Sequence, residues 1–309
     1  MFASPLKSRL VSRESEALAK KVLVIGDYIN DVVVRPLGIT RHDTDVRAEI
    51  EMTSGGSAAN FACWLATLGL EVTLVSRVSE RDVAQIGLDL SRWDVNAQLQ
   101  ADPELPTGSI VAVVEGEART FFTQRGANQK LSFQDLKVDR DFDLVYLSGY
   151  SVAGIDDTEG LVQFLQEMCS QGIPIAVDPG SAGFIADFSV NRFLEIVDGA
   201  DFFFPSLQEG ALLTGESQPD VIAKGLAERF GEVALTLGAS GAIAANSFHL
   251  IHSEAEPAEL VDAIGAGDAF AAGYLAQRLQ GNDLTQALGA ANRLGALAVG
   301  RSGGRPALS

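Results

Sequence analysis

A glycine-rich segment near the C-terminal end of the chain has the residue types needed to hold an anion beside a base. Residues 262–268 read Asp-Ala-Ile-Gly-Ala-Gly-Asp and lead directly into a predicted helix. The small residues Gly265, Ala266 and Gly267 let backbone N–H groups approach an anion, and the helix N-terminus adds a partial positive charge. A carboxylate at Asp268 would lie beside that anion and could accept a proton from an attacking hydroxyl group. The segment therefore predicts an anion hole with a general base at its edge.

The same residues also permit a purely structural interpretation, in which Asp268 caps the helix and the glycines form a tight turn. Neither common nucleotide-binding fingerprint accounts for the segment. The chain contains no G-x-x-x-x-G-K-[ST] P-loop, and the segment is not a G-x-G-x-x-G dinucleotide motif. At this level both interpretations of Asp268 stay open.

Short apolar runs alternate with segments of helical periodicity along most of the chain. Val22–Ile25, Leu144–Ser148 and Ile173–Asp178 have strand length, whereas Ser57–Leu68 and Asp157–Ser170 carry apolar residues at helical spacing. This alternation predicts a three-layer α/β fold, with a mostly parallel central sheet covered by helices on both faces.

Two regions, about 32–53 and 109–123, break the alternation and have the pattern of antiparallel hairpins. The second hairpin is predicted to turn at Glu115-Gly116-Glu117. We expect the two hairpins to form a small second sheet outside the main one.

Composition excludes several classes of function. With 309 residues, 47% of them hydrophobic, the chain can bury one large core. Its longest apolar runs have strand length and fall short of the about 18–20 residues that a membrane span requires. On this basis we do not expect a membrane as a partner. The net charge of −18 repels phosphate backbones, so we do not expect nucleic acid as a partner either. A nucleotide pocket needs only local backbone amides, a helix N-terminus and a bound cation.

Residues 1–20 are polar and mixed in charge, without an apolar stretch before a small-residue cleavage site. We therefore expect a loose leader and a cytoplasmic protein, followed by a single domain over residues 21–309. The two cysteines, Cys63 and Cys169, lie in helix-like apolar patterns. This placement predicts reduced core thiols and not a disulfide or a metal–thiolate site.

Two motifs resemble those of the ribokinase or PfkB-type carbohydrate kinase family. The family's C-terminal signature, D-T-x-G-A-G-D-x-F, is matched at Asp262, Gly265, Ala266, Gly267, Asp268 and Phe270. Its G-G-x-x-x-N loop is matched at Gly55, Gly56 and Asn60. The motifs lie about 200 positions apart in the family's order, which is more specific than either motif alone. The similarity extends from about Lys21 to Pro306.

The resemblance implies a ribokinase-like fold and ATP-dependent phosphorylation of a hydroxymethyl group on a small sugar of the ribose, fructose or ketosugar type. Asp268 would be the general base, and Gly265, Ala266 and Gly267 would receive the charge of the transferred phosphoryl group. The hairpins would form a lid that closes over the sugar and excludes water. In this family such a lid often pairs with a second copy, so a homodimer through the lid is a further expectation.

On the sugar side, Asp31 matches the family carboxylate that binds two sugar hydroxyls. Gly55, Gly56 and Asn60 match the substrate loop, in which the glycines also act as the hinge for lid closure. Asn128, in an Arg-Gly-Ala-Asn run, matches a segment that lines the sugar side. The structural alternatives are a βα turn with a helix-capping amide for the loop, and a turn asparagine for Asn128.

On the nucleotide side, Thr236, Gly238 and Gly241 match the family loop that packs against the phosphates and ribose of ATP. Asn292 falls where the family carries an adenine-side residue. Each of these residues alone is also compatible with ordinary surface polarity.

The cation-binding positions depart from the family pattern. Glu209 matches the glutamate of the N-x-x-E motif, which organises water molecules around Mg²⁺, but Ser206 replaces the asparagine on the nucleotide side. Asp262 and neighbouring carbonyl groups can form the K⁺ site that some ribokinases have, although Ala307 stands in place of a serine ligand.

Two rival functions stay open. A nucleoside kinase acting on adenosine, inosine or pseudouridine would phosphorylate the same type of hydroxymethyl group, with Tyr28, Phe121 and Phe122 as candidates for a wall against the base. A sugar-sensing binding protein would keep the fold without turnover. The intact Asp268 argues against the sensor, and Ser206 argues weakly for it.

Overall fold

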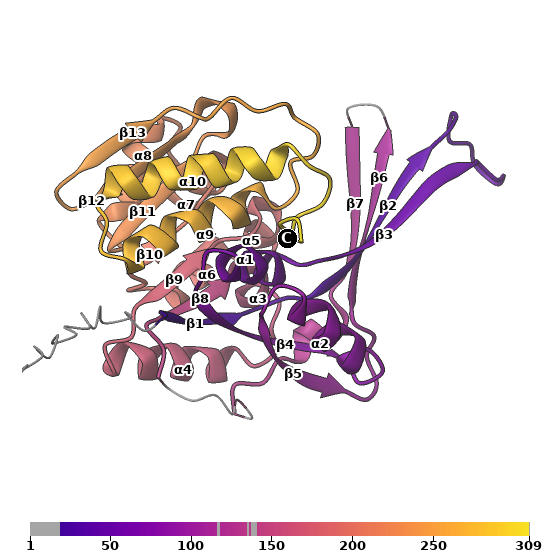
Figure 1. The fold of residues 1–309 in the computed structure, drawn as a ribbon, viewed down its shortest axis with the longest axis horizontal. Coiled ribbons are helices and arrows are strands. Elements are labelled where there is room, and N and C mark those ends of the chain that lie inside the picture. The colour runs from indigo at the N-terminus through magenta and orange to yellow at the C-terminus, as the bar shows by residue number, and fades with distance from the viewer. Residues whose placement is uncertain (1–18, 116–117, 135, 137–140, 309) are drawn as a thin grey trace, which may run out of the picture.

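The structure is a computed structural model that describes residues 19–115, 118–134, 136 and 141–308. Residues 1–18 of the predicted leader lie outside the described residues, as do Gly116 and Glu117 of the predicted hairpin turn. The described part consists of a main body and a smaller sheet that projects away from it (Figure 1).

Nine strands form the main sheet, as the alternation of apolar runs and helices predicts. Neighbouring strands from β5 to β11 are parallel, and β12 and β13 add an antiparallel edge. In order across the sheet, the strands are β13 (Leu250–Ser253), β12 (Ala242–Asn246), β11 (Glu232–Thr236), β10 (Phe202–Phe203), β9 (Ile175–Asp178), β8 (Leu144–Ser148), β1 (Lys21–Ile25), β4 (Glu71–Ser79) and β5 (Asn96–Asp102).

Helices cover both faces of this sheet, so the main body has three layers. Successive side chains of β1 enter opposite cores, because side-chain direction alternates along a strand. The core that contains Val22 and Val24 is closed by α1 (Ser57–Ala66), α2 (Val83–Ser91), α9 (Ala266–Leu279) and α10 (Leu284–Val299). The core that contains Leu23 and Ile25 is closed by α4 (Thr158–Ser170), α5 (Ala182–Phe188), α6 (Val190–Ile196), α7 (Leu207–Thr214) and α8 (Pro219–Ala227). The short helices are α3 (Gly149–Val152), η1 (Gly126–Lys130) and η2 (Gly238–Ser240).

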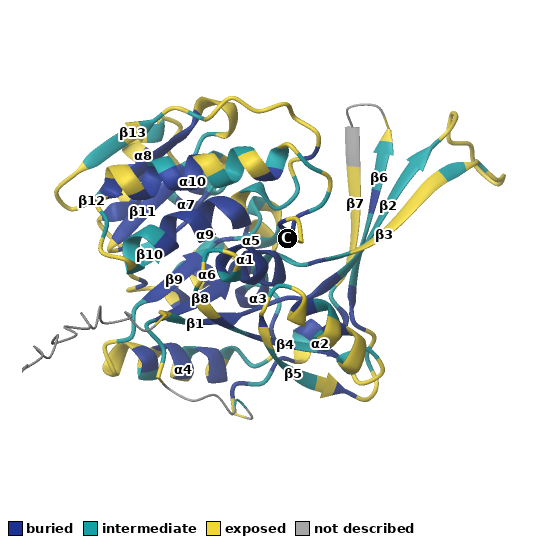
Figure 2. Cartoon of the chain, in the orientation of Figure 1, coloured by how far each residue is buried: buried dark blue, intermediate teal, exposed yellow. Residues whose placement is uncertain are grey.

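A second sheet, which we call the lid sheet, consists of four strands. In order they are β3 (Ala48–Gly55), β2 (Ile29–Pro36), β6 (Gly108–Glu115) and β7 (Ala118–Gln124). The outer pairs are antiparallel, as the hairpin patterns predict, and the central pair β2–β6 is parallel. Much of the projecting sheet is exposed or only half-buried (Figure 2).

Two interpretations of the sequence are corrected. Helix α9 begins at Ala266 with Gly265 at the N-cap, and the Asp268 side chain makes no capping hydrogen bond. Cys63 is buried as expected, but Cys169 is exposed because it falls on the solvent side of α4. Within the described residues, no helix combines the length and apolar character needed to cross a membrane.

Candidate active site

A cavity of about 520 Å³ opens between the lid sheet and the main sheet. Strands β2, β6 and β7 supply one wall, and residues at the carboxyl ends of β9 and β11 contribute to the other. Open α/β sheets commonly bind ligands at this edge. The charged residues that line the cavity, within the described part of the chain, are Asp27, Asp31, Arg125, Asp178, Glu209 and Asp268.

Asp268 lies buried in the first turn of α9, with both carboxylate oxygens engaged. Its Oδ1 accepts a hydrogen bond from Ser57 Oγ at 2.7 Å, and its Oδ2 accepts one from Asn60 Nδ2 at 3.3 Å. Burial raises the pKa of Asp268 to about 7; the negative charge of Asp27 acts in the same direction, and the Ser57 hydrogen bond opposes it. A carboxyl group with this pKa can act as a base at neutral pH.

The glycines before Asp268 have different steric requirements. Gly265 adopts a φ of 75°, and a Cβ atom there would lie 2.5 Å from Gly304 Cα, so no side chain fits. Gly267 lines the cavity, yet a Cβ there would meet no heavy atom of the described residues within 4 Å. The open space beside Gly267 lets a ligand phosphate approach the start of α9. Ala266 is the first helical residue and does not itself line the cavity.

Asp31 enters the cavity from β2, and the glycine loop is shaped around it. A Cβ at Gly55 would overlap the Asp31 carboxylate. Gly56 has a φ of 97°, and its Cβ would lie 2.5 Å from the Asp27 carbonyl oxygen. Burial, followed by the negative charge of Asp27, raises the pKa of Asp31 to about 6. Gly55 is therefore required for this position of Asp31, and Gly56 for the close approach of the loop to Asp27. Gly56 lines the cavity, whereas Gly55 does not.

The two predicted asparagines, Asn60 and Asn128, line the cavity and are largely occupied by protein contacts. Asn60 Oδ1 is buried without a partner among the described residues. Asn128 Nδ2 donates to the Tyr28 carbonyl at 3.0 Å, and its Oδ1 accepts from Ser76 Oγ at 3.2 Å. Asn128 thus connects η1 to the segment between β1 and β2. It therefore does more than the turn asparagine of the structural alternative.

A pair of carboxyl groups lies on the wall formed by the main sheet. Burial raises the pKa of Glu209, and burial together with the charges of Glu209 and Asp268 raises the pKa of Asp178. Two such groups fit a hydrated Mg²⁺, which proteins usually hold with one or two carboxylates plus substrate phosphates. The described residues contain no group of three or more His, Cys, Asp or Glu side chains placed to hold a metal ion.

Ser206 has a structural role that the motif did not reveal. The Ser206 N–H donates to Glu209 Oε2 at 2.7 Å, and the Glu209 N–H donates to Ser206 Oγ at 3.3 Å. This capping box starts α7 and fixes the Glu209 carboxylate at the cavity wall. Serine in place of the family asparagine therefore keeps the position of Glu209 well defined.

The predicted nucleotide residues are only partly brought to the cavity. Thr236 lines it, whereas Gly238, Gly241 and Asn292 are not among its lining residues. Asn292 Nδ2 donates to the Glu254 carbonyl oxygen at 2.9 Å, so the amide holds the chain that follows β13. Gly241 is required sterically, because a Cβ there would overlap the backbone after β13.

Asp262 also lies outside the cavity lining. Its Oδ1 accepts from the Ile264 N–H at 3.1 Å, and its Oδ2 accepts from the Gly303 N–H at 3.3 Å. The carboxylate thus ties the loop before α9 to the C-terminal tail.

Of the three aromatic residues proposed to contact a base, only Phe121 lines the cavity. Phe122 is exposed, and because it neighbours Phe121 on β7 it points to the opposite face of the lid sheet. Tyr28 is buried and its hydroxyl donates to Asp89 at 2.9 Å, which removes it from the wall.

Sequence reasoning missed three polar residues of the site: Asp27, Ser57 and Asp178. Asp27 accepts from the Ser57 N–H and from Ser148 Oγ, both at 3.0 Å. Asp178 is the last residue of β9, and Ser57 is the first residue of α1. Their positions in the sequence could have indicated a role in the site. Each lies at or beside the end of a strand or helix, on the sheet edge where open α/β sheets bind ligands.

Comparison with known proteins places this arrangement in a family. The model of the pfkB family of carbohydrate kinases matches residues 19–309. The chain belongs to this family. Among curated relatives, this pfkB-family kinase is 28% identical over 269 residues to the 2-dehydro-3-deoxygluconokinase of Bacillus subtilis, covering 79% of this chain and 80% of the relative. It is 27% identical over 299 residues to the ATP-dependent ribose-1-phosphate kinase of Halopiger xanaduensis, covering 93% and 94%.

Solved structures of related kinases share the fold. Adenosine kinase from Sinorhizobium meliloti superposes with a TM-score of 0.83 at 23% identity, covering 93% of this chain and 96% of that one. An E. coli protein described as ribokinase II, solved with ATP and Mg²⁺, superposes with a TM-score of 0.81 at 25% identity, covering 94% and 96%. The predicted ribokinase-like fold and the ATP-dependent carbohydrate kinase class are thereby confirmed.

Proposed function

We propose that this pfkB-family kinase transfers the γ-phosphoryl group of ATP to a hydroxymethyl group of a small sugar, with Asp268 as the general base. The observation that supports this most directly is the convergence of Asp268, Gly267 and Asp31 on one cavity. A base, an open backbone site for an anion and a carboxylate suited to a diol are the three parts that phosphoryl transfer to a sugar requires.

In the proposed reaction, the acceptor hydroxyl attacks the γ-phosphorus of ATP, its proton passes to Asp268, and ADP leaves. Asp31 would accept hydrogen bonds from two other hydroxyls of the acceptor, with Asn60 and Gly56 beside it. The backbone N–H groups from Gly265 to Gly267 would receive the charge that develops on the phosphoryl oxygens. Closure of the lid sheet would exclude water as a competing acceptor.

Cations complete the proposal on the nucleotide side. Glu209 and Asp178 would hold the water shell of Mg²⁺, which supplies charge neutralisation for the phosphates of ATP. Thr236, with the loop that contains Gly238 and Gly241, would border the phosphates and the ribose of ATP.

We also assign a K⁺ site to Asp262 and the nearby carbonyl groups. The test compares turnover in potassium chloride with turnover in tetramethylammonium chloride, and a bound K⁺ that activates the enzyme should make turnover higher in potassium chloride.

A nucleoside kinase is the second candidate, because Phe121 lines the cavity from the lid sheet. An aromatic ring at this place would stack on a nucleobase. Both candidates share the base and the anion site, so only the acceptor separates them.

The decisive experiment is an ADP-release assay with a panel of ketoses, aldoses, sugar acids, sugar phosphates and nucleosides. Acceptor-dependent ADP release from at least one sugar supports the proposal, and release with nucleosides alone supports the second candidate. Saturable binding of a sugar without ADP production would favour a sensor and overturn the kinase assignment.

Assembly through the lid sheet is a further part of the proposal. The cross-strand row Met52, Val32, Val111 and Phe122 gives the face opposite the cavity an apolar surface. Met52 is 76% exposed and Phe122 is 60% exposed. Contiguous exposed apolar groups on a sheet favour pairing with a second copy of the same sheet.

A further inference from the structure

The cavity has an asymmetric distribution of charge. Five of its described lining residues are carboxylic acids and one, Arg125, is a cation. Each of the five acids already has a role. Asp268 is the proposed base, Asp31 the diol site, and Asp178 and Glu209 the Mg²⁺ site, while Asp27 accepts hydrogen bonds from Ser57 and Ser148. Arg125 has no function in that scheme, although it lines the same cavity.

Arg125 lies on the acceptor side of the cavity. Phe121 and Thr123 line the cavity from β7, and Arg125 continues this alternation one residue beyond the end of the strand. Thr123 pairs with Ile110, and Ile110 pairs with Asp31, so these three residues form one row across the lid sheet. Arg125 is therefore two positions from the row that contains the proposed diol carboxylate.

Among the described residues, the groups that contact the guanidinium group of Arg125 are neutral. It stacks over the Phe184 ring with Cζ 5.6 Å from the centroid, and its Nη2 donates to the Tyr150 carbonyl. Nη1 is buried without a partner, and no described carboxylate forms an ion pair with Arg125. Burial lowers the pKa of Arg125, whereas the charge of Asp27 opposes that effect. A half-buried cation normally has an anionic partner, because its desolvation is otherwise uncompensated.

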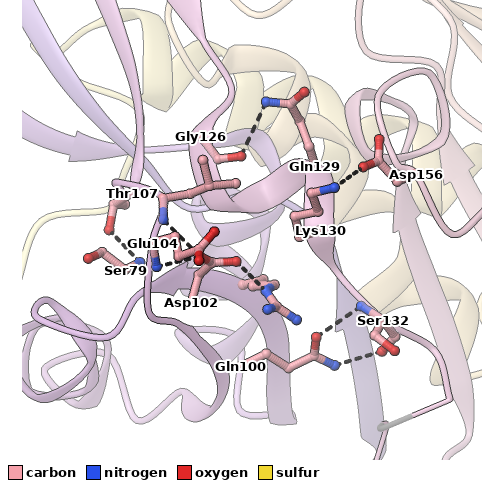
Figure 3. Close-up of polar contacts among 12 residues, drawn as sticks. Ser79, Gln100, Asp102, Glu104, Thr107, Gly126, Gln129, Lys130, Ser132 and Asp156 are labelled. Atoms are coloured by element: carbon pink, nitrogen blue, oxygen red, sulfur yellow. Dashed lines mark hydrogen bonds and ion pairs between the residues drawn. The ribbon is translucent and has the colours of Figure 1, made fainter.

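The fold keeps space for this group and fixes its backbone. A Cβ at Gly154 would overlap the guanidinium group, so the absence of a side chain at Gly154 leaves the space that this group occupies. The helix η1 that follows Arg125 is anchored to its surroundings: Lys130 pairs with Asp156 at 2.6 Å (Figure 3), and the Ala127 N–H donates to the Pro106 carbonyl oxygen at 2.8 Å. Arg125 is thus a positioned cation and not a mobile surface residue.

We propose that Arg125 binds an oxyanion of the acceptor, either a carboxylate or a phosphate ester, and that the kinase therefore selects acidic sugars over neutral ones. This inference rests on the proposed function and adds the substrate class. The planar guanidinium group suits both oxyanions, because it can donate two parallel hydrogen bonds to either. The γ-phosphate of ATP is also an oxyanion that could bind Arg125. We assign Arg125 to the acceptor instead, because it lies next to the strand row that contains Asp31.

The test compares three matched pairs of acceptors: ribose with ribose 1-phosphate, fructose with fructose 6-phosphate, and glucose with gluconate. Steady-state kinetics with wild type and Arg125→Gln give KM for each acceptor and for ATP. Gly154→Ala is a second variant, which retains the arginine but displaces the guanidinium. Arg192→Gln is the matched control, because Arg192 stacks on Phe188 at 5.2 Å in the same way but is exposed and outside the cavity lining.

In wild type we expect at least one acidic acceptor to have a kcat/KM about tenfold or more above that of its neutral partner. Arg125→Gln and Gly154→Ala are expected to abolish this preference while KM for ATP changes by less than about threefold. A purely structural role would raise KM for acidic and neutral acceptors alike, and binding to ATP would raise KM for ATP instead. Either result overturns the inference, as does a preference for the neutral member of all three pairs.

Calorimetric titration of the same six acceptors without ATP separates this inference from the proposed function. Acid-selective binding that is lost in Arg125→Gln, without ADP release from any acceptor, would support the acidic ligand and overturn the kinase reaction. ADP release from neutral acceptors without acid-selective binding would support the kinase reaction and overturn the inference.

Discussion

Ser57 Oγ donates a 2.7 Å hydrogen bond to Asp268 Oδ1 across 211 positions of the chain. Ser57 begins α1 directly after the glycine loop that is shaped around Asp31, and Asp268 lies in the first turn of α9. The bond therefore connects the proposed acceptor loop to the proposed base. It also fixes the rotamer of Asp268, so that the carboxylate is oriented before a substrate binds.

Asp268→Asn tests the general base. The amide cannot accept the proton, so kcat should fall about a thousandfold or more, while KM for ATP stays within about threefold. Single-turnover and steady-state ADP release measure the two quantities. Asp141→Asn changes an exposed acid outside the cavity lining; it is the control and should behave as wild type. Retention of more than about a tenth of wild-type turnover would show that Asp268 is not the base.

The raised pKa of Asp268 predicts opposite effects of pH on activity and stability. Activity should rise with pH to a plateau above about pH 7, because the base must be ionised. Between its ordinary pKa of 3.8 and about 7, folded Asp268 holds a proton that the unfolded chain has released, so the free energy of unfolding falls as pH rises.

Asp268→Asn removes this buried charge. At pH 8 the variant should be more stable than wild type, by at most about 4 kcal/mol, and the difference should disappear near pH 4. Thermal unfolding at the two pH values measures it. Equal stability of the two proteins at pH 8 would contradict the raised pKa.

Gly55→Ala tests the position of Asp31. The added Cβ would overlap the Asp31 carboxylate and displace it, so KM for the acceptor should rise about tenfold or more, with KM for ATP little changed. Gly38→Ala is the matched control, because Gly38 lies in the segment after β2 and a Cβ there meets nothing within 4 Å. An unchanged acceptor KM in Gly55→Ala would remove Asp31 from the proposed diol site.

Arg305→Gln tests a buried cation behind the site. Arg305 is buried between the rings of Tyr28 and Trp93, at 5.2 and 5.1 Å from their centroids, and its Nη1 pairs with Asp89. Loss of the cation leaves Asp89 poorly compensated, and we expect about 3 kcal/mol of destabilisation. Denaturant unfolding measures it.

The same substitution should alter catalysis through Asp31. Arg305 opposes the rise in the pKa of Asp31, so its removal should move the acid limb of kcat/KM for the acceptor to higher pH. Arg92→Gln is the control, because Arg92 contacts Asp89 at 3.8 Å from an exposed position and should contribute less than about 1 kcal/mol. A larger loss of stability in Arg92→Gln than in Arg305→Gln would contradict this account.

Met52→Lys tests assembly through the lid sheet. A charge at the β3 end of the apolar row should convert a dimer into a monomer, because an ammonium group cannot be buried there without a partner. Light scattering coupled to size exclusion measures the mass of wild type and variant. Phe248→Lys changes an even more exposed apolar residue, in the turn after β12, and should leave the mass unchanged. A monomeric wild type would reject the interface.

Local sequence patterns were sufficient for the layers of the fold. The strand Leu144–Ser148 has the bounds that its apolar run predicts, and the helix predicted over Asp157–Ser170 spans Thr158–Ser170 with Asp157 at its N-cap. Hydrophobic periodicity is a property of neighbouring residues, and so it survives in the sequence. The small residues from Gly265 to Gly267 are also visible in the sequence, and they indicate a place where another group can approach the backbone closely.

Contacts between distant segments could not be predicted in this way. The capping box of Ser206 with Glu209 is not such a contact, because its two residues are three positions apart and carry a local sequence signature. Asn292 is an example of a contact between distant segments. Its amide donates to the Glu254 carbonyl oxygen, and this bond forms only because α10 packs against the chain after β13.

The amino-acid sequence by itself determined which residues can do chemistry and that they lie at the ends of strands and helices. Only the tertiary structure decided that Ser57 donates a hydrogen bond to Asp268, that Asp178 and Glu209 line one cavity, and that Arg125 occupies the space left by Gly154. The reason is physical: periodicity is encoded over a few residues, whereas the charge and free volume around a side chain are set by segments that meet only when the chain is packed.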